Sequence, residues 1–324
     1  MEYKSFFERF DEKEEFIDRK TITDEETVDV IIPTINTNIF FTKNLHSYYR
    51  EIPINRLIVG DAGSTDDTRE ILSKFPRVKI IDQSNFNSLG YCIAKLMSVV
   101  ETEWFIYLHA DVYLAENWYN TMKKYQDKYD FYECDRNDVI IIETRKPGLE
   151  NVTRAFSGSQ MCRKEAFKNI IPKIEDNYLY RNEDIIFDEL IRAEGYKYGR
   201  IFDTYHHHQS MKRKGMKQPK IYNIIIHQQK DINNVLRTAN MQARGIIKYL
   251  KPKPYLISQV YNSLMKLKSY NALNTNEFMA WVKKNNEEWL KYIKIEKSFH
   301  IKIYEKLVSL INIIFKKIEK LRII

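Results

Sequence analysis

The stretch Leu57-Ile58-Val59-Gly60-Asp61-Ala62-Gly63-Ser64-Thr65-Asp66 decides the fold class of this 324-residue chain. A short apolar run ends at an acid, and glycine, serine and threonine then turn the chain toward a helical segment. A second apolar run, residues 104–108, ends in the same way at His109-Ala110-Asp111. Because ligands collect at the carboxyl ends of strands in an open α/β sheet, we expect both acids at one crevice, where they can hold a nucleotide and a metal.

The pattern around these runs is typical of βαβ units, since short apolar segments alternate with helical periodicity from about residue 28 to 208. The expected fold class is therefore α/β, a Rossmann-like, mainly parallel sheet flanked by helices, with a mostly helical C-terminal extension. Strands are expected at 28–33, 56–60, 78–81, 104–108 and 139–143. Helices are expected after a cap at 64–66, over 90–100 and near 116–129.

Three regions are predicted along the chain. Residues 1–27 form a charged, helical N-terminal extension, and residues 28–210 form the nucleotide-binding and catalytic domain. Residues 211–324 form a basic, mainly helical region that begins with a loop at 211–220 and is broken at Lys251-Pro252-Lys253-Pro254.

Composition favours a globular protein with a core, because 44% of the residues are hydrophobic and 30% are charged. No apolar run approaches the ~18 residues that span a bilayer, and residues 1–20 do not resemble a secretory signal. Cys92, Cys134 and Cys162 are far apart, which argues against a structural zinc site or a disulfide framework. A cytoplasmic location is expected.

Positive charge is concentrated in the last third of the chain. Residues 211–324 contain 24 Lys and Arg against 7 Asp and Glu, although the whole chain carries only +8. Residues 301–324 combine apolar positions at helical spacing with bases, which suits a helix lying on an anionic membrane surface, peripheral on its cytoplasmic face. The alternative is a helix that packs on its own domain or on a partner. Few aromatics accompany the bases at 211–220, so no nucleic-acid partner is expected.

These elements, in their order, resemble the metal-dependent glycosyltransferases of family 2, which have the GT-A fold. Asp-Ala-Gly-Ser-Thr-Asp at 61–66 matches the family signature Asp-(Asp/Ala)-Gly-Ser-x-Asp. Arg-Lys-Glu-Ala-Phe at 163–167 matches Arg-(Arg/Lys)-Glu-x-Phe, and 183–196 resembles Glu-Asp-x-x-Leu-x-x-Arg-x-x-x-Gly-Tyr. The resemblance covers roughly 28–210 and implies an inverting, nucleotide-sugar-dependent enzyme, with a hexosyltransferase expected.

The resemblance also implies a set of donor-binding residues. Asp61 would accept a hydrogen bond from the base or ribose, and the backbone at the end of the first strand would wrap the base. The alternative for Asp61 is a capped strand–helix turn made of ordinary turn residues. The full donor-side prediction comprises Pro33, Thr34, Asp61, Gly63, Ser64, Lys95, His109 and Ala110.

His109-Ala110-Asp111 stands where the family has Asp-x-Asp, with histidine in place of the first acid. Asp111 is therefore the expected ligand of Mn²⁺ or Mg²⁺, and His109 is expected on ribose or phosphate. A histidine after the acceptor helix supplies a further ligand in related enzymes, which favours His208 and then His206. Consecutive histidines cannot all face one way, and a polar exposed turn is the alternative.

Asp184 is expected to be the general base that removes the proton of the acceptor hydroxyl. Glu183 and Gln160 are expected on the acceptor side. The alternative is that Asn182, Glu183 and Asp184 only cap a helix and favour its dipole. The implied partners are a nucleotide sugar, UDP-linked or GDP-linked with UDP favoured, and a glycan or lipid-linked acceptor.

Two rival functions remain. A nucleotidyltransferase can have the same fold and use a metal in the same way. It usually has a glycine-rich basic segment after the first strand, whereas 34–38 contains neither glycine nor base. A non-catalytic scaffold that binds membranes or polyanions would rest on the basic region alone. The chain has no G-x-G-x-x-G and no G-x-x-x-x-G-K-(S/T) motif, so neither a dinucleotide fingerprint nor a P-loop is indicated.

Overall fold

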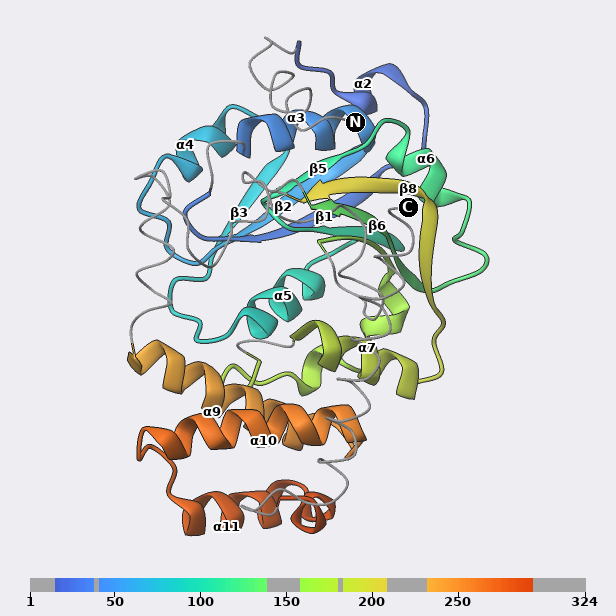
Figure 1. The fold of residues 1–324 in the computed structure, drawn as a ribbon. Helices are drawn as coiled ribbons and strands as arrows, with labels where there is room; N and C mark the ends of the chain where they lie inside the picture. Colours follow the sequence, from blue (N-terminus) through green and yellow to red (C-terminus); the bar gives the residue numbers. More distant parts are fainter. Residues whose placement is uncertain (1–14, 38–40, 139–157, 180–182, 209–231, 294–324) are drawn as a thin grey trace, which may run out of the picture. The chain divides into compact units, whose positions relative to one another are not determined.

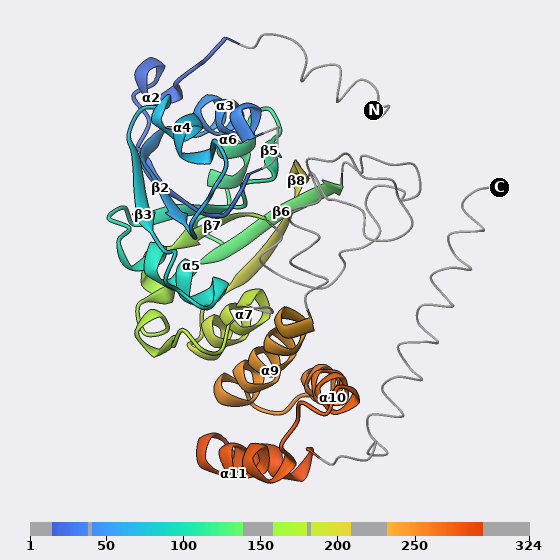
Figure 2. The ribbon, with the colours of Figure 1, turned by 90° about the vertical axis from the view of Figure 1, so that its left-hand side faces the viewer.

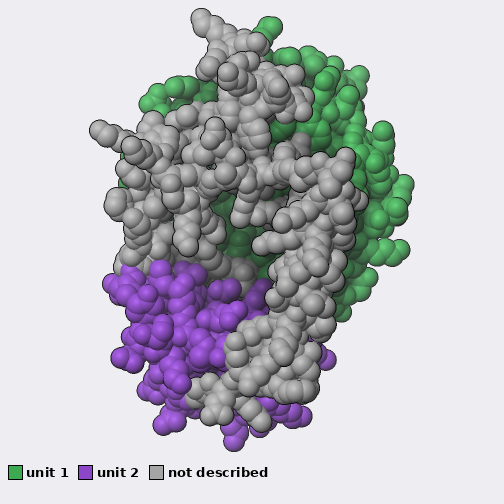
Figure 3. All heavy atoms as spheres, viewed as in Figure 1, with its two compact units in different colours: residues 1–176, 182–217 green, residues 177–181, 218–324 purple. Residues whose placement is uncertain are grey.

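The computed structural model describes residues 15–37, 41–138, 158–179, 183–208 and 232–293. The chain divides into two compact units, unit 1 with residues 1–176 and 182–217 and unit 2 with residues 177–181 and 218–324 (Figure 3). The predicted domain boundary at 210 lies outside the described residues. So do the predicted strand 139–143, the loop 211–220 and the terminal helix 301–324.

Unit 1 is built on one eight-stranded sheet with the order β3-β2-β1-β4-β7-β6-β8-β5. The pairs β3–β2, β2–β1, β1–β4 and β6–β8 are parallel, and β4–β7, β7–β6 and β8–β5 are antiparallel. The strands are β1 (Val28–Thr34), β2 (Ile54–Asp61), β3 (Val78–Asp82), β4 (Trp104–Leu108), β5 (Val112–Leu114), β6 (Phe131–Asp138), β7 (Ser159–Arg163) and β8 (Tyr198–His208).

Helices cover both faces of this sheet (Figure 1) (Figure 2). On one face, α3 (Phe41–Glu51), α4 (Thr68–Ser73) and α6 (Trp118–Lys123) surround a core that includes Tyr48, Leu72 and Trp118. On the other face lie α5 (Leu89–Ser98) and α7 (Glu183–Ala193). The short helices α2 (Arg19–Ile22), η1 (Lys164–Phe167) and η2 (Ile171–Lys173) complete the described part of unit 1.

The predicted strands in the first half of the chain are confirmed as β1 to β4. β1, β2 and β4 are largely buried, whereas β3 ends the strand order and is half-buried to exposed. The helix predicted over 90–100 is confirmed as α5, and α6 is shorter than the predicted 116–129. The N-cap of α4 is Asp67, one residue after the end of the predicted cap at 64–66. Helix α4 starts at Thr68, whose amide donates to Asp66 Oδ1 at 3.1 Å.

The described part of the N-terminal extension is fixed to unit 1 through Arg19. Its guanidinium donates to the carbonyl of Glu51 at 3.0 Å, to Asn120 Oδ1 at 2.6 Å and to both carboxylate oxygens of Glu25. These contacts join the extension to α3 and α6.

Unit 2 consists of α9 (Ile232–Tyr249), α10 (Pro254–Ser269), α11 (Thr275–Asn285) and the short η4 (Glu287–Lys291). The break predicted at 251–254 is confirmed, since α9 ends at Tyr249 and Pro254 opens α10. Trp289 is fully buried in this unit, and its indole nitrogen donates to the Leu250 carbonyl at 2.7 Å. The predicted fold class, a mainly parallel α/β sheet followed by a helical region, is confirmed. Among the helices of the described ranges, none has the length and apolar character needed to cross a membrane.

Candidate active site

The carboxyl ends of β1, β2 and β4 form one edge of the sheet, as expected for parallel strands. Thr34 pairs with Asp61 across β1 and β2, and Ile31 of β1 pairs with Tyr107 of β4. Pro33 lies beyond the last residue of β1 that pairs with β4, so its missing amide removes no hydrogen bond on that side. Two of the predicted acids therefore follow strands that end at this edge.

Asp61 is completely buried, and both of its carboxylate oxygens have partners within unit 1. Oδ1 accepts from the Ser64 amide at 2.9 Å, and Oδ2 accepts from Nε of Arg69. Burial alone raises the pKa of this carboxyl, but the hydrogen bonds from Ser64 and the charge of Arg69 outweigh it and hold the pKa below its ordinary value. Asp61 is thus an ionised acceptor, and each oxygen retains a lone pair.

Gly63 and Ser64 shape the turn that follows Asp61. Gly63 has φ of +91°, and a Cβ on it would lie 3.2 Å from Cβ of Ser84, so glycine is needed there on both counts. The Ser64 hydroxyl accepts from the Asn36 amide at 2.9 Å, which ties this turn to the residues after β1. The predicted donor residues Pro33, Thr34, Asp61, Gly63 and Ser64 are therefore brought together.

Lys95 is not brought to this group by any contact among the described residues. It is exposed on α5, with Nζ 4.9 Å from the ring centroid of Tyr91.

The turn at 109–112 is held by two side chains of α3. Asn44 Nδ2 donates to the Ala110 carbonyl at 2.8 Å. The buried Tyr48 hydroxyl lies 2.9 Å from the carbonyl oxygen of His109 and 2.7 Å from that of Val112. This backbone is fixed before any ligand binds, and Ala110 contributes to it through its carbonyl.

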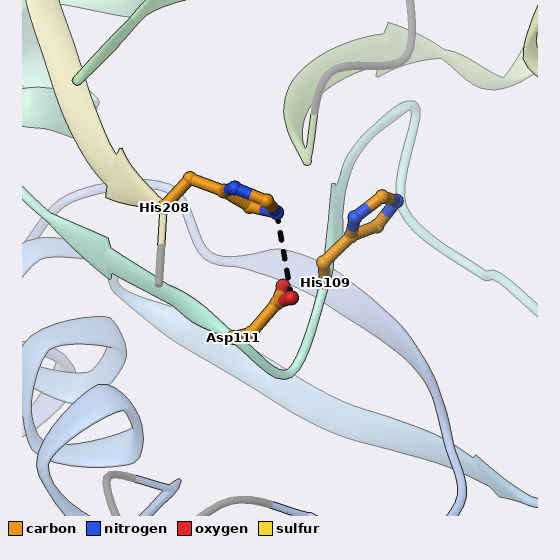
Figure 4. A group of neighbouring side chains, drawn as sticks. All are labelled: His109, Asp111 and His208. Carbon is orange, nitrogen blue, oxygen red and sulfur yellow. Dashed lines mark ion pairs between the residues drawn. The ribbon is translucent and has the colours of Figure 1, made fainter. Parts of the chain in front are cut away.

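His109, Asp111 and His208 form a group whose ligand atoms all lie within 4.8 Å of one another. Figure 4 shows His208 at the end of β8 and Asp111 after β4 pointing toward each other, with the His109 ring beside them. The distance from His208 Nε2 to Asp111 Oδ2 is 3.4 Å. The antiparallel pairing of β5 with β8 creates this meeting, because it sets Val112 opposite His208.

The chemistry of this group suits a divalent metal. Within the described part of the chain, Asp111 Oδ1 is buried without a hydrogen-bond partner, so this oxygen can donate an electron pair to a cation. Burial lowers the pKa of His109 to about 4, which keeps its imidazole neutral as a metal ligand must be. Burial alone raises the pKa of Asp111, but the imidazole of His208 reverses this and the pKa lies well below the ordinary value. Two imidazoles and a carboxylate suit Mn²⁺ better than Mg²⁺, which prefers oxygen ligands.

His206 lies outside this group of three. It is fully buried on β8, with Nδ1 2.7 Å from the Ser159 hydroxyl and 3.3 Å from Cys134 Sγ. The alternative of a polar exposed turn at 206–208 is wrong, because these residues are the last of a paired strand. Nε2 of His206 has no hydrogen-bond partner in the described ranges.

Tyr107 connects the group of three with the acids of α7. Its hydroxyl lies 2.9 Å from His109 Nε2. Burial raises the pKa of Tyr107 well above its ordinary value, and the negative charges of Glu183, Asp184 and Asp111 raise it further. Both predicted acids at the start of α7 are therefore within electrostatic reach of this hydroxyl, whereas Asn182 lies outside the described residues.

Gln160 is opposite Tyr107 in the β4–β7 pairing. It is fully buried, and neither its amide nitrogen nor its amide oxygen has a hydrogen-bond partner among the residues that the structure describes. Buried amides are nearly always paired, so the unpaired amide of Gln160 is available to a ligand on the same side of the sheet as Tyr107.

Residues 29–186 match the family described as Glycosyl transferase family 2. This part of the chain is a family 2 glycosyltransferase domain. Such domains use nucleotide-sugar donors, and the reaction class of the chain is glycosyl transfer.

Similar solved structures include S. aureus TarS residues 1–349 in complex with UDP-GlcNAc, at 17% identity and a TM-score of 0.48, covering 83% of this chain and 80% of that one. Another is GalNAc-T7 with UDP, GalNAc and Mn²⁺, at 13% identity and a TM-score of 0.48, covering 80% of this chain and 57% of that one. Comparison with curated protein sequences gives no match.

Sequence reasoning missed several residues that position the site of this glycosyltransferase domain. They are Asn44, Tyr48 and Tyr107. Gly158 and Ser159 were expected only on the acceptor side. Tyr107 lies within the apolar run 104–108 and therefore resembles a core residue. Nothing in the sequence places α3 beside the turn at 109–112. Gly158 has φ of +117°, and its carbonyl accepts from the His109 amide at 2.8 Å. The only hint of this in the sequence was Gly158 itself, a single glycine before the polar residues Ser159 and Gln160.

Proposed function

We propose that this chain is an inverting hexosyltransferase that uses a UDP-linked donor in preference to a GDP-linked one, with Mn²⁺ bound by His109, Asp111 and His208. The acceptor is a hydroxyl of a glycan or of a lipid-linked glycan. The observation that carries the proposal is the meeting of these three side chains at the carboxyl edge of the sheet, with Tyr107 between them and the acids of α7.

Asp61 and the backbone at Pro33 and Thr34 bind the nucleoside at the β1–β2 end of this edge. A bound divalent metal would neutralise the charge that develops on the departing diphosphate. Asp184 accepts the proton of the acceptor hydroxyl as its oxygen attacks the anomeric carbon and the bond to the diphosphate breaks. Gln160 and Glu183 orient that hydroxyl, which the unpaired, buried amide of Gln160 supports. One displacement inverts the anomeric centre.

We assign His206 a supporting role on β8, two residues before His208. Its Nδ1 side is fixed by Ser159, and its ring cannot shift without breaking that contact. His206 therefore helps to fix the end of β8, the strand that carries His208.

The test is a donor panel. We expect wild-type protein with Mn²⁺ to release UDP from UDP-linked hexoses faster than GDP from GDP-linked ones, by transfer to water where no acceptor is present. We expect Asp111→Asn to abolish this release, and the exposed matched control Glu116→Gln to retain it. Release of pyrophosphate from nucleoside triphosphate and sugar phosphate would instead favour a nucleotidyltransferase. If no nucleotide is released from any donor, with or without Mn²⁺, the result would favour the non-catalytic scaffold that binds membranes or polyanions.

A further inference from the structure

Unit 2 contains a cavity of about 290 Å³ between α9, the start of α11 and the segment that joins α10 to α11. Its polar lining comes from Arg237, Asn240 and Arg244 of α9 and from Asn274 and Glu277 at the start of α11, and Phe278 contributes an apolar wall. The cavity lies wholly within this unit and shares no residue with the site on the sheet.

The guanidinium of Arg244 is held in place from two sides. Its carbon lies 4.6 Å from the ring centroid of Trp281 and 5.5 Å from that of Phe278. Its Nε donates to Asn240 Oδ1 at 3.0 Å, one turn earlier on α9. Stacking and this hydrogen bond fix the plane of the group, so little side-chain entropy remains to be lost when a ligand binds.

The two terminal nitrogens of Arg244 have no acidic partner within the described part of the chain. An arginine is always charged, and its flat fork matches a phosphate or carboxylate with two parallel hydrogen bonds. The fixed guanidinium of Arg244 at the wall of the cavity is therefore suited to bind an oxyanion.

The surrounding charge favours the same ligand class. Arg237 lines the cavity two turns before Arg244 on the same face of α9, and Glu277 is the only acid among the lining residues. The described residues 232–293 of unit 2 carry 10 bases and 3 acids, so this unit attracts polyvalent anions more than singly charged ones.

We propose that this cavity binds a phosphate-bearing ligand, with its phosphate on the fork of Arg244 and its organic part beside Phe278. The volume is roughly ten times the ~30 Å³ that one water occupies in the liquid, so it admits a phosphate together with a small attached group. The phosphate can belong to a free small molecule or to the headgroup of a lipid. The proposal is independent of the activity assigned to the sheet.

The test is calorimetric titration of the full-length chain with inorganic phosphate and with glycerol phosphate. We expect Arg244→Gln to weaken binding at least tenfold. Glu277→Gln removes the one lining acid, keeps the backbone amide that donates to Asn274 Oδ1 in the α11 cap, and should tighten binding about threefold. Lys284→Gln, an equal charge change at an exposed position on α11 outside the cavity, should change the affinity less than twofold.

Equal weakening by Arg244→Gln and Lys284→Gln would overturn the proposal, because binding would then follow net charge alone. Absence of binding to both ligands by wild-type protein would also overturn it. If Arg244→Gln does not fold, the gain expected for Glu277→Gln still decides, and a loss there contradicts the proposal.

A vesicle measurement distinguishes the two sources of the phosphate. Arg244-dependent binding to phosphatidylglycerol vesicles, displaced by glycerol phosphate and absent with phosphatidylcholine, supports a lipid headgroup. Binding of glycerol phosphate without Arg244-dependent vesicle binding supports a soluble phosphate ester.

Discussion

The Tyr107 hydroxyl lies 2.9 Å from Nε2 of His109, which leaves Nδ1 as the ring nitrogen that can face Asp111 and His208. In the metal-binding tautomer, Nε2–H donates to the Tyr107 oxygen. Partners of this kind orient a ligating imidazole and raise its basicity. The contact comes from two residues at the end of one strand, and it makes Tyr107 a positioning residue of the proposed metal site.

Removing this hydroxyl should weaken metal binding without unfolding unit 1. We expect Tyr107→Phe to lower the Mn²⁺ affinity by about 10- to 100-fold, the usual effect of losing such a partner. Titration of free Mn²⁺ by paramagnetic resonance measures this. Tyr119→Phe, which removes a hydroxyl 3.4 Å from the Glu26 carbonyl and away from the site, is the control and should retain the wild-type affinity. Equal affinities for all three proteins would contradict this role of Tyr107.

Gly158 should be required beside His109. A Cβ at this position would lie 3.1 Å from Val112 Cγ2 and 3.4 Å from His109 Nδ1. We expect Gly158→Ala to cost about 1–3 kcal/mol of stability, because its φ of +117° disfavours any side chain. We also expect weaker Mn²⁺ binding, because the new methyl displaces the imidazole.

Gly195 separates these two effects. Its φ is +91°, but a Cβ there would have no atom within 4 Å. Gly195→Ala should therefore destabilise unit 1 while leaving the Mn²⁺ affinity unchanged. If both alanine variants lose Mn²⁺ affinity equally, backbone strain and not contact with His109 explains the loss.

Low pH should lower the stability of unit 1 through Asp29, the fully buried second residue of β1. Burial alone raises the pKa of Asp29, but hydrogen bonds from Arg56, the Glu101 amide and Asn55 outweigh it and bring the pKa below 3.8. Because the folded-state pKa is lowered, this carboxylate stabilises the fold above pH ~4, and the stabilisation is lost as pH falls through the folded-state pKa.

Arg56→Met tests this account. Arg56 Nη2 lies 2.5 Å from Asp29 Oδ2, and breaking a buried pair on one side costs about 3 kcal/mol. Denaturant unfolding at pH 7 should show this loss in the free energy of unfolding. At pH 3 the difference in unfolding free energy between wild type and variant should be smaller. Lys74→Met, which breaks an exposed pair with Glu70, should cost under ~0.5 kcal/mol. If the stability lost in Arg56→Met is the same at every pH, the acid sensitivity of unit 1 does not come from Asp29.

Asp184→Asn tests the proposed base. We expect kcat to fall by about 10²- to 10⁴-fold, the usual contribution of a positioned general base. The affinities for Mn²⁺ and for nucleotide should be unchanged, because Asp184 lies outside the metal group. A loss of nucleotide affinity with kcat preserved would assign Asp184 to donor binding instead.

The first half of the sheet could be predicted from the sequence because its strands are apolar runs with an acid or a turn after them. β7 and β8 could not, since Ser159–Arg163 and Tyr198–His208 are largely polar and gain their order from partners distant in the chain. The helix α3 was also missed. It supplies Asn44 and Tyr48, which fix the turn at 109–112.

The candidate site was predictable in its residue types and only partly in its arrangement. Asp111 and His208 were expected as ligands from the resemblance, and both belong to the group of three. His109 was expected on ribose or phosphate, and it lies in the same group. The β5–β8 register brings His208 to Asp111, and no local sequence pattern encodes that register. The roles of these residues remain predictions.

The central claim is a metal-dependent nucleotide site built on Asp111. The most direct measurement is the thermal stability of wild type and Asp111→Asn with UDP, GDP, CMP and dTDP, each with and without Mn²⁺. We predict that UDP raises the melting temperature of wild type only when Mn²⁺ is present, and that Asp111→Asn shows no such increase while Glu116→Gln does. Stabilisation by UDP that persists without Mn²⁺ or in Asp111→Asn would contradict the claim.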